Sequence, residues 1–255
     1  MLVAERHREI VAIIERERSV RVSNLARYFQ VTEETIRRDL ERLDADGKLI
    51  RSHGGAVSAQ AMGREAPDAE RETRAAPEKQ AIAREALNLI KDGDTILIDA
   101  STTALHLARM LPDMPVTVVT NAARVAIELA TRSRMRVMCT GGTLSPASQS
   151  FVGPQAERAL SDYHVNWLFC SCTGVDPVYG LSDTNEAQAA LRQKMLAAAH
   201  QRCLMVDTGK FGLRALKRFG DMSDIDILIT NEGVDPDLVE QLQAKGPTVI
   251  VAPMP

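Results

Sequence analysis

The feature that most constrains this fold is an alternation of short apolar segments with helical patterns over the last two thirds of the chain. The apolar segments have the length and composition of buried strands, and they lie at 95–99, 116–119, 136–139, 165–171, 203–206, 225–229 and 248–251. Helical patterns stand between them, for example at 185–200 and 236–244. Such alternation predicts an α/β domain whose mainly parallel sheet has helices on both faces.

The rest of the chain divides into a small N-terminal domain and a linker. Residues 58–76 are rich in Ala, Glu, Arg, Pro and Gly and have almost no apolar periodicity, which is typical of a linker. Pro77 then suits the first turn of a new helix. We therefore expect domains at 1–57 and 77–255, with a linker at 58–76.

The N-terminal domain has three helical patterns, at 4–18, 23–29 and 32–44, with a short β-like stretch at 20–22. In the third pattern Thr32 is a suitable helix cap, and Ile36, Leu40 and Leu43 fall on one face, which should be buried. Asp39 flanks that face and is expected to pair with an arginine inside the domain. The helix 32–44 follows a tight turn, which is the geometry that enters a major groove of DNA.

The opposite face of helix 32–44 carries Glu34, Arg38 and Arg42, with Thr35 and Arg37 on its flanks. Solvated surface charges are the alternative explanation for this pattern. The segment 49–57 that follows has a strand, a turn with Arg51, His53 and Gly54, and a second apolar step, which suits a two-stranded wing. Glycines in that turn would let the backbone approach a phosphate closely.

Charge and cysteine content limit the possible classes. The chain carries a net charge of −3, and residues 1–57 hold eleven basic and ten acidic residues, so DNA binding would depend on placed arginines and a doubled site rather than on bulk charge. This argues against an architectural DNA binder that ignores sequence. No segment is apolar enough to span a membrane and no secretion signal is evident, so we expect a cytoplasmic protein. Cys139, Cys170, Cys172 and Cys203 lie in apolar segments without metal-ligand spacing, so we expect reduced core thiols and no metal site.

Polar loops follow the predicted strands, where ligands bind in parallel sheets. Hydroxyls and free amides at a helix start suit a phosphate, glycines expose main-chain donors, carboxylates accept from sugar hydroxyls, and a lysine between glycines suits a phosphate or carbonyl. The candidate ligand-binding residues are Asp99, Ser101, Thr102, Thr103, Asn121, Gly141, Gly142, Asp176, Glu186 and Lys210. An ordinary polar turn is the alternative explanation for each loop.

The motif TIRRDL at 35–40, followed by LIRSHGGA at 49–56, resembles the signature of the DeoR family of bacterial transcription regulators, and the similarity extends over nearly the whole chain. The resemblance implies a winged helix-turn-helix domain and a sensor domain similar in fold to ribose-phosphate isomerases. It implies that Ser101, Thr102 and Thr103 grip a sugar phosphate, and that Gly141, Gly142, Glu186 and Lys210 line the same pocket. Two positions depart from the family pattern: Ser101 is often glycine, and Arg192 is lysine in many members.

We therefore expect a DNA-binding regulator, in the first instance a repressor of a carbohydrate-utilisation operon released by a phosphorylated sugar, which binds operator DNA as a homo-oligomer and needs no cofactor. An activating role is left open. The residues expected at the DNA are Thr32, Glu34, Thr35, Arg37, Arg38, Arg42, Arg51, His53 and Gly54, with Arg38 reading a base edge. The alternative is a sugar-phosphate isomerase with a regulatory head, using Asp99, Asp176, Asp183 or Glu186 as base.

Overall fold

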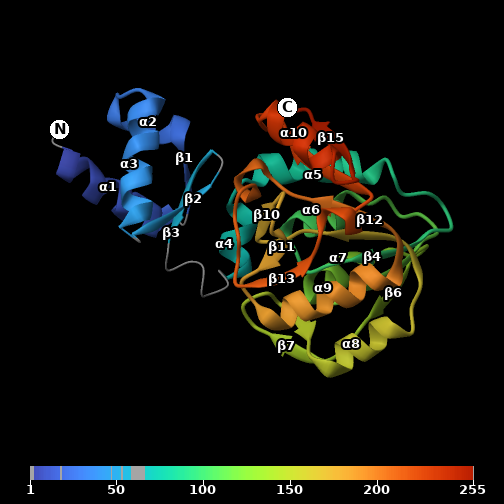
Figure 1. Ribbon diagram of the computed structural model, residues 1–255. Coiled ribbons are helices and arrows are strands. Elements are labelled where there is room, and N and C mark those ends of the chain that lie inside the picture. The colour runs from blue at the N-terminus through green and yellow to red at the C-terminus, as the bar shows by residue number, and fades with distance from the viewer. Residues whose placement is uncertain (1–2, 18, 47, 53, 59–66, 255) are drawn as a thin grey trace.

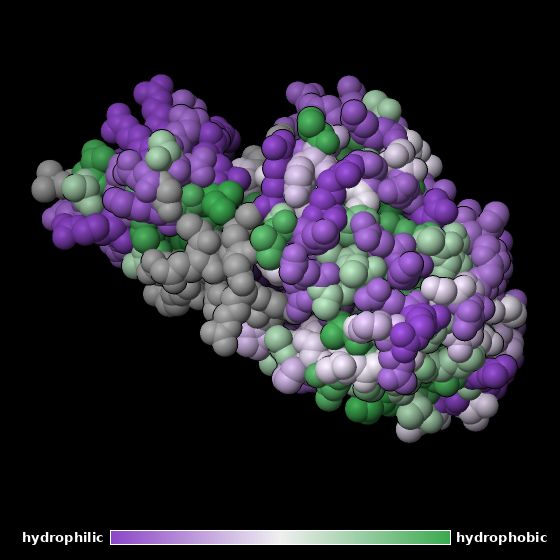
Figure 2. Space-filling model, turned by 60° about the horizontal axis from the view of Figure 1, so that its bottom comes forward, coloured by the Kyte–Doolittle hydropathy of each residue, from purple (hydrophilic) through white to green (hydrophobic). Residues whose placement is uncertain are grey.

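The computed structural model describes residues 3–17, 19–46, 48–52, 54–58 and 67–254. They form two domains that lie side by side, a small N-terminal head and a larger α/β domain (Figure 1). Figure 2 shows these two lobes from another side, with hydrophilic residues over much of the outer end of the head. Within the described ranges, no helix is long and apolar enough to cross a membrane.

The head contains three helices and a three-stranded antiparallel sheet of order β1-β3-β2. Its elements are α1 (Val3–Glu17), β1 (Ser19–Arg21), α2 (Val22–Phe29), α3 (Glu33–Ala45), β2 (Leu49–Ser52) and β3 (Gly55–Ser58). α2 ends at Gln30, whose left-handed backbone (φ 54°) makes the turn into α3. The predicted wing had two strands, but β1 pairs with β3 and adds a third, because Ser19 to Arg21 run antiparallel to Val57 to Gly55.

The head has its own hydrophobic core. Ile36 and Leu40 of α3 are fully buried and pack with Ile10 of α1 and Leu25 of α2, as the periodicity predicted. Each such side chain contributes roughly 1.5–3 kcal/mol when it is removed from water. The core therefore fixes which face of α3 points outward.

The second domain is built on a parallel sheet of seven strands in the order β15-β14-β12-β9-β4-β5-β6. The strands are β4 (Thr95–Ile98), β5 (Thr117–Thr120), β6 (Arg136–Cys139), β9 (Val165–Cys170), β12 (Ala199–Met205), β14 (Ile227–Asn231) and β15 (Thr248–Ala252). Each corresponds to one predicted strand, so the fold class is confirmed. Cys139, however, is exposed on the edge strand β6, so the expectation of a core thiol is wrong there, while the other three cysteines are buried.

Helices cover both faces of this sheet and create two hydrophobic cores. One core contains α5 (Ala76–Leu87), α6 (Thr102–Met110) and α7 (Ala123–Leu129). The other contains α8 (Pro154–Ser161), α9 (Glu186–Ala198) and α10 (Pro236–Gln243). Successive strand residues alternate between the two cores, as Ile96 and Leu97 do, because side chains along a strand point to opposite faces.

Several smaller elements were not predicted. They are a sheet of β10 (Gly174–Asp176), β11 (Gly180–Asp183) and β13 (Lys217–Gly220), a hairpin of β7 (Thr143–Ser145) and β8 (Ser150–Val152), and the short helix α4 (Asp68–Thr73). α4 corrects the expected linker at 58–76. Residues 59–66 lie outside the described ranges, but α4 is held to the α/β domain by an ion pair between Asp68 and Arg124 and by another between Glu72 and Arg124.

Candidate functional site

The first candidate site is the outer face of α3 in the head. Thr32 caps this helix, its Oγ1 accepting from the amide of Thr35 at 3.2 Å. Asp39 lies on the inner side, where Arg6 donates to it at 2.6 Å and His7 lies within 2.9 Å, which confirms its expected role inside the domain. Burial alone raises the pKa of Asp39, but the hydrogen bonds from Arg6 and His7 outweigh it and lower that pKa below its ordinary value.

Two arginines of the outer face pair with glutamates of the same helix. Arg37 lies 2.8 Å from Glu33 and Arg38 3.2 Å from Glu34, each one helical turn away. Exposed pairs of this kind contribute roughly 0–1 kcal/mol and are exchanged easily. Arg38, with 73% of its side chain exposed, is therefore available to a DNA base, and Arg42 is also exposed.

The two glycines of the wing, Gly54 and Gly55, differ in how closely other backbone approaches them. A Cβ on Gly54 would meet no atom of the described residues within 4 Å, whereas a Cβ on Gly55 would lie 1.8 Å from the carbonyl oxygen of Val20. Gly55 is thus required for the close approach of β1. Arg51 pairs with Glu41 of α3 at 2.8 Å, and His53 lies outside the described residues.

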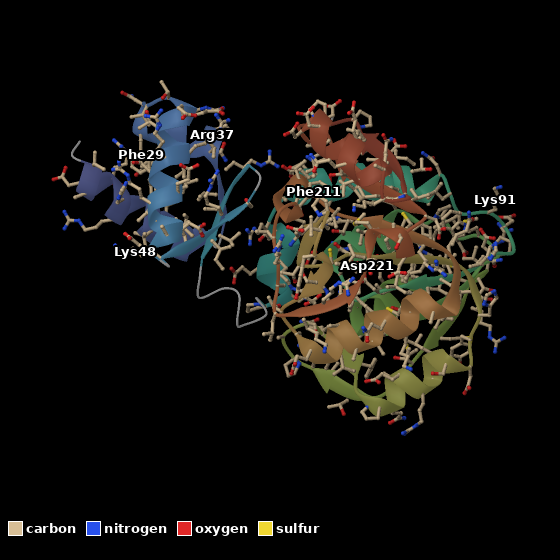
Figure 3. All side chains as sticks on the ribbon, viewed as in Figure 1. Phe29, Arg37, Lys48, Lys91, Phe211 and Asp221 are labelled. Atoms are coloured by element: carbon tan, nitrogen blue, oxygen red, sulfur yellow. The ribbon has the colours of Figure 1, made fainter. Side chains whose placement is uncertain are left out.

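The second candidate site is a cavity of about 790 Å³ between the head and the α/β domain. Its walls come from the loops after β4, β9 and β12, the corner between α4 and α5, and β1 and α2 of the head. Arg37 of α3 also lines it, and Figure 3 shows that side chain on the flank of the head nearest the α/β domain. Residues of both domains therefore line the cavity.

The start of α6 forms one wall. The Ser101 hydroxyl accepts from the amide of Ala104 at 3.1 Å, so this serine caps the helix. Among the described residues, no hydrogen bond engages the amides of Thr102 and Thr103, which are helix-start donors suited to an anion. Ser101, Thr102 and Thr103 all line the cavity, as does Lys210.

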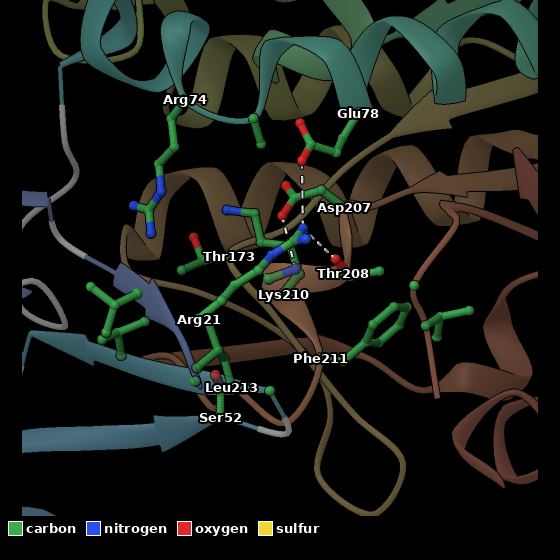
Figure 4. Close-up of a pocket in the computed structure, with 18 of the residues that line it drawn as sticks. Arg21, Ser52, Arg74, Glu78, Thr173, Asp207, Thr208, Lys210, Phe211 and Leu213 are labelled. Carbon is green, nitrogen blue, oxygen red and sulfur yellow. Dashed lines mark hydrogen bonds and ion pairs between the residues drawn. The ribbon is translucent and has the colours of Figure 1, made fainter. Parts of the chain in front are cut away.

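Cationic side chains gather at the same place. Lys79 is buried and donates to the carbonyl oxygens of Arg71 and, at 2.6 Å, of Arg74. Burial lowers the pKa of Lys79 to about 8, and repulsion from Lys210 is the next largest cause. In Figure 4 Arg74 and Lys210 point into one space beside Thr173. This wall of the cavity favours an anion.

Arg192 lines the floor of the cavity and is paired with two carboxylates. Its guanidinium donates to Asp99 at 2.9 Å and pairs with Asp183. Burial opposes its charge, but Asp183 and Asp99 raise the pKa of Arg192 above its ordinary value. Asp99 also accepts from the amide of Ser101 at 2.9 Å, so its role is to hold the start of α6. Asp99 is 1% exposed and does not line the cavity, contrary to its predicted role.

Five other predicted ligand residues do not line this cavity. Asn121 is buried and donates to the carbonyl oxygen of Phe151 at 3.2 Å. Asp176 holds a turn and accepts from Arg214 at 2.9 Å. Gly141 and Gly142, both with positive φ, turn the chain into the β7–β8 hairpin, and Glu186 is exposed at the start of α9.

Other residues outside the candidate set also line the cavity. Among them are Arg71, Arg74, Lys79 and, from the head, Arg21, together with Thr173 and Thr208 from loops in which the sequence analysis had chosen other residues. The charges at 71 and 74 were visible in the sequence, but they lie in the segment predicted to be a linker, whereas Lys79 lies in the predicted helix that begins at Pro77. Arg21 contacts a residue 187 positions away, which local sequence patterns do not reveal.

Comparison with known proteins agrees with this two-part arrangement. Residues 6–61 match the family model of the DeoR-like helix-turn-helix domain, and residues 74–232 match that of the DeoR C-terminal sensor domain. The chain therefore belongs to the DeoR family of transcription regulators, whose members bind DNA through that helix-turn-helix domain.

Relatives match nearly end to end. The HTH-type transcriptional regulator YulB of Bacillus subtilis is 48% identical over 100% of this chain and 98% of its own length. The regulator GlpR of Haloferax volcanii is 35% identical over 98% of each chain. The L-fucose operon activator of Escherichia coli K12 is 33% identical over 90% of this chain and 95% of its own. Among solved structures, ribose 5-phosphate isomerase from Methanocaldococcus jannaschii aligns over 52% of this chain and 53% of its own, with 17% identity and a TM-score of 0.39.

Proposed function

We propose that this regulator represses a carbohydrate-utilisation operon and that a phosphorylated sugar, bound in the cavity between the domains, releases it from operator DNA. The observation that carries the proposal is the convergence of the α6 amides at Thr102 and Thr103 with Lys79 and Lys210 on one cavity. Helix-start amides and lysines are standard phosphate ligands, and about 790 Å³ leaves room for the sugar. The relatives described as regulators of sugar operons support the effector class.

In this proposal Arg38 reads a base edge in the major groove, and Arg37, Arg51 and His53 contact phosphates or the wing's minor groove. Glu34 and Thr35 tune the base preference, Arg42 contacts the DNA from the same outer face, and Gly54 lets the wing backbone approach a phosphate. Thr32 lies at the DNA as the cap of the recognition helix. A homo-oligomer, dimer or tetramer, would place two heads on half-sites roughly 34–36 Å apart or a multiple of that spacing. The regulator would act in the cytoplasm, on the operator.

We propose no catalytic role. Of the four carboxylates considered as isomerase bases, Asp183 lines the cavity but is paired with Arg192, and Asp99 lies beneath it in the same pairing. A base for isomerisation must reach the sugar carbon with an available oxygen. The relatives that match this chain over nearly their full length are transcription regulators, which favours sensing over catalysis.

A thermal-shift screen tests the effector class. The full chain is heated with a panel of phosphorylated sugars and the matching free sugars, because a ligand at 100 times its dissociation constant adds about 2.7 kcal/mol of stability. We expect one phosphosugar to raise the melting temperature, its free sugar to do nothing, and Lys210→Ala to abolish the effect. Lys91→Ala, an exposed lysine far from the cavity, is the matched control (Figure 3). A shift that survives in Lys210→Ala would place the ligand elsewhere.

A further inference from the structure

One side chain of the head reaches across to the α/β domain. Arg21 is the last residue of β1 and stands at the start of α2. Its Nη2 donates to the Oγ1 of Thr208 at 2.7 Å and lies 3.5 Å from a carboxylate oxygen of Glu78. Figure 4 shows Arg21 extending from the head toward both residues and Lys210.

The two residues that Arg21 contacts belong to the elements that carry the cavity's lysines. Thr208 opens the 3-10 turn η2 (Thr208–Lys210), and Glu78 directly precedes Lys79 on α5. The turn is fixed independently of the head, because the Thr208 amide donates to Asn231 at 3.0 Å and the Gly209 amide to Asp207 at 3.0 Å. Arg21 is thus positioned by a rigid wall of the cavity.

The contacts that hold Arg21 are weak enough to be rearranged. Its side chain is 45% exposed, and the 3.5 Å pair with Glu78 is longer than a good charge-assisted hydrogen bond. A dianion held between Lys79, Lys210 and the α6 amides would attract this guanidinium, which has further donors to offer. Arg21 itself lines the cavity.

We propose that the DNA-binding head supplies Arg21 as a ligand to the phosphate of the effector, so that the effector site is completed only when the head is docked against the sensor domain. This rests on the proposed phosphosugar site. In the same docked arrangement Arg37 of α3 also lines the cavity. An anion that binds Arg21 stabilises the docked position of the head. If DNA binding requires a different head position, the anion therefore weakens DNA binding by linkage.

The test measures binding of inorganic phosphate to the full chain by calorimetry. Arg21→Gln keeps a hydrogen-bond donor for Thr208 but removes the charge, whereas Arg21→Lys keeps the charge. We expect phosphate binding about tenfold weaker in Arg21→Gln, as for loss of a hydrogen bond to a charged group, and substantially restored in Arg21→Lys. Arg27→Gln, an exposed arginine of α2, is the control in the head and should bind as the unmodified chain does.

Hydrogen exchange on the same samples reports the docking. We expect phosphate to slow amide exchange over 19–29 of the head in the unmodified chain, and not in Arg21→Gln. If Arg21→Gln binds phosphate as tightly as the unmodified chain while Lys210→Ala does not, this inference is overturned and the effector site stands. If neither phosphate nor any phosphosugar binds the unmodified chain, both are overturned.

Discussion

The outer face of α3 in the head and the Arg192 cluster in the sensor domain use charged residues in opposite ways. On α3 of the head, Arg37 and Arg38 are exposed and pair with glutamates of their own helix. In the sensor domain Arg192 is buried between Asp99 and Asp183. Exposed pairs contribute little and can be exchanged for a ligand, whereas a buried pair is costly to break. Burial therefore distinguishes charges that recognise a partner from charges that hold the fold.

The strongest test of this comparison is the substitution Arg192→Met, which leaves two buried carboxylates without their cation. We expect a loss of about 3–5 kcal/mol in the free energy of unfolding. The single tryptophan, Trp167, lies in β9, so its fluorescence in a urea titration reports the sensor domain.

Arg214→Met is the matched control, because Arg214 also pairs with an aspartate but its side chain is 56% exposed. A much smaller loss than in Arg192→Met is expected there, because solvent screens the exposed pair. Equal losses in the two variants would show that burial does not separate the two kinds of arginine.

For the head, Arg38→Ala should weaken operator binding by about 1–3 kcal/mol and relax the preference at one base position. The thermal unfolding transition of the head, followed by the helical circular-dichroism signal, should not move, because the exposed pair with Glu34 contributes little to folding. Fluorescence anisotropy with operator DNA and single-base variants of it measures both effects. Arg37→Ala, by contrast, should weaken all sequences alike and lower the salt dependence. If Arg37→Ala changed the base preference and Arg38→Ala did not, Arg37 rather than Arg38 would be the residue that reads a base.

A third prediction concerns pH and the docking of α4. Hydrogen bonds from Arg124, opposed by burial and helped by Arg109, lower the pKa of Glu72 to about 2. A depressed carboxyl pKa contributes stability that is present above the unfolded pKa of about 4.5 and is lost as pH falls toward 2.

Because Glu72 is partly exposed, we expect a contribution of about 1 kcal/mol. Glu72→Gln should be less stable than the unmodified chain near neutral pH and equal to it near pH 2, measured by urea titration across that range. A constant difference at all pH values would contradict the role assigned to Glu72.

The smallest effect expected is on anion affinity. Burial and neighbouring cations lower the pKa of Lys79 to about 8, so this lysine loses its charge as pH rises through that value. Sulfate keeps its charge over the same range and is the appropriate probe. We expect its affinity to fall severalfold between about pH 7 and pH 9.5, and Lys79→Met to bind more weakly with a flatter profile. If sulfate affinity depended on pH in Lys79→Met as it does in the unmodified chain, Lys79 would not belong to the anion site.

The sequence predicted the seven sheet strands and the buried face of α3 because both depend on local periodicity. It did not predict which loops meet. The cavity lies at the ends of β4, β9 and β12, which are adjacent, whereas β6 is at the edge of the sheet, so Gly141 does not line it. Asn121 follows β5, a neighbour of β4, but its side chain is buried and donates to the Phe151 carbonyl oxygen. Strand order is a long-range property. Lys79 and Arg21 were missed for the same reason, since their contacts depend on how α4, α5 and the head pack together.

The most direct test of the central claim is operator affinity with and without the phosphosugar that the thermal screen identifies. Anisotropy titrations would compare the unmodified chain, Lys210→Ala and Lys91→Ala. The account predicts that the phosphosugar weakens operator binding at least tenfold in the unmodified chain and in Lys91→Ala, and leaves Lys210→Ala bound. Operator affinity that is the same with and without the phosphosugar in the unmodified chain would contradict it.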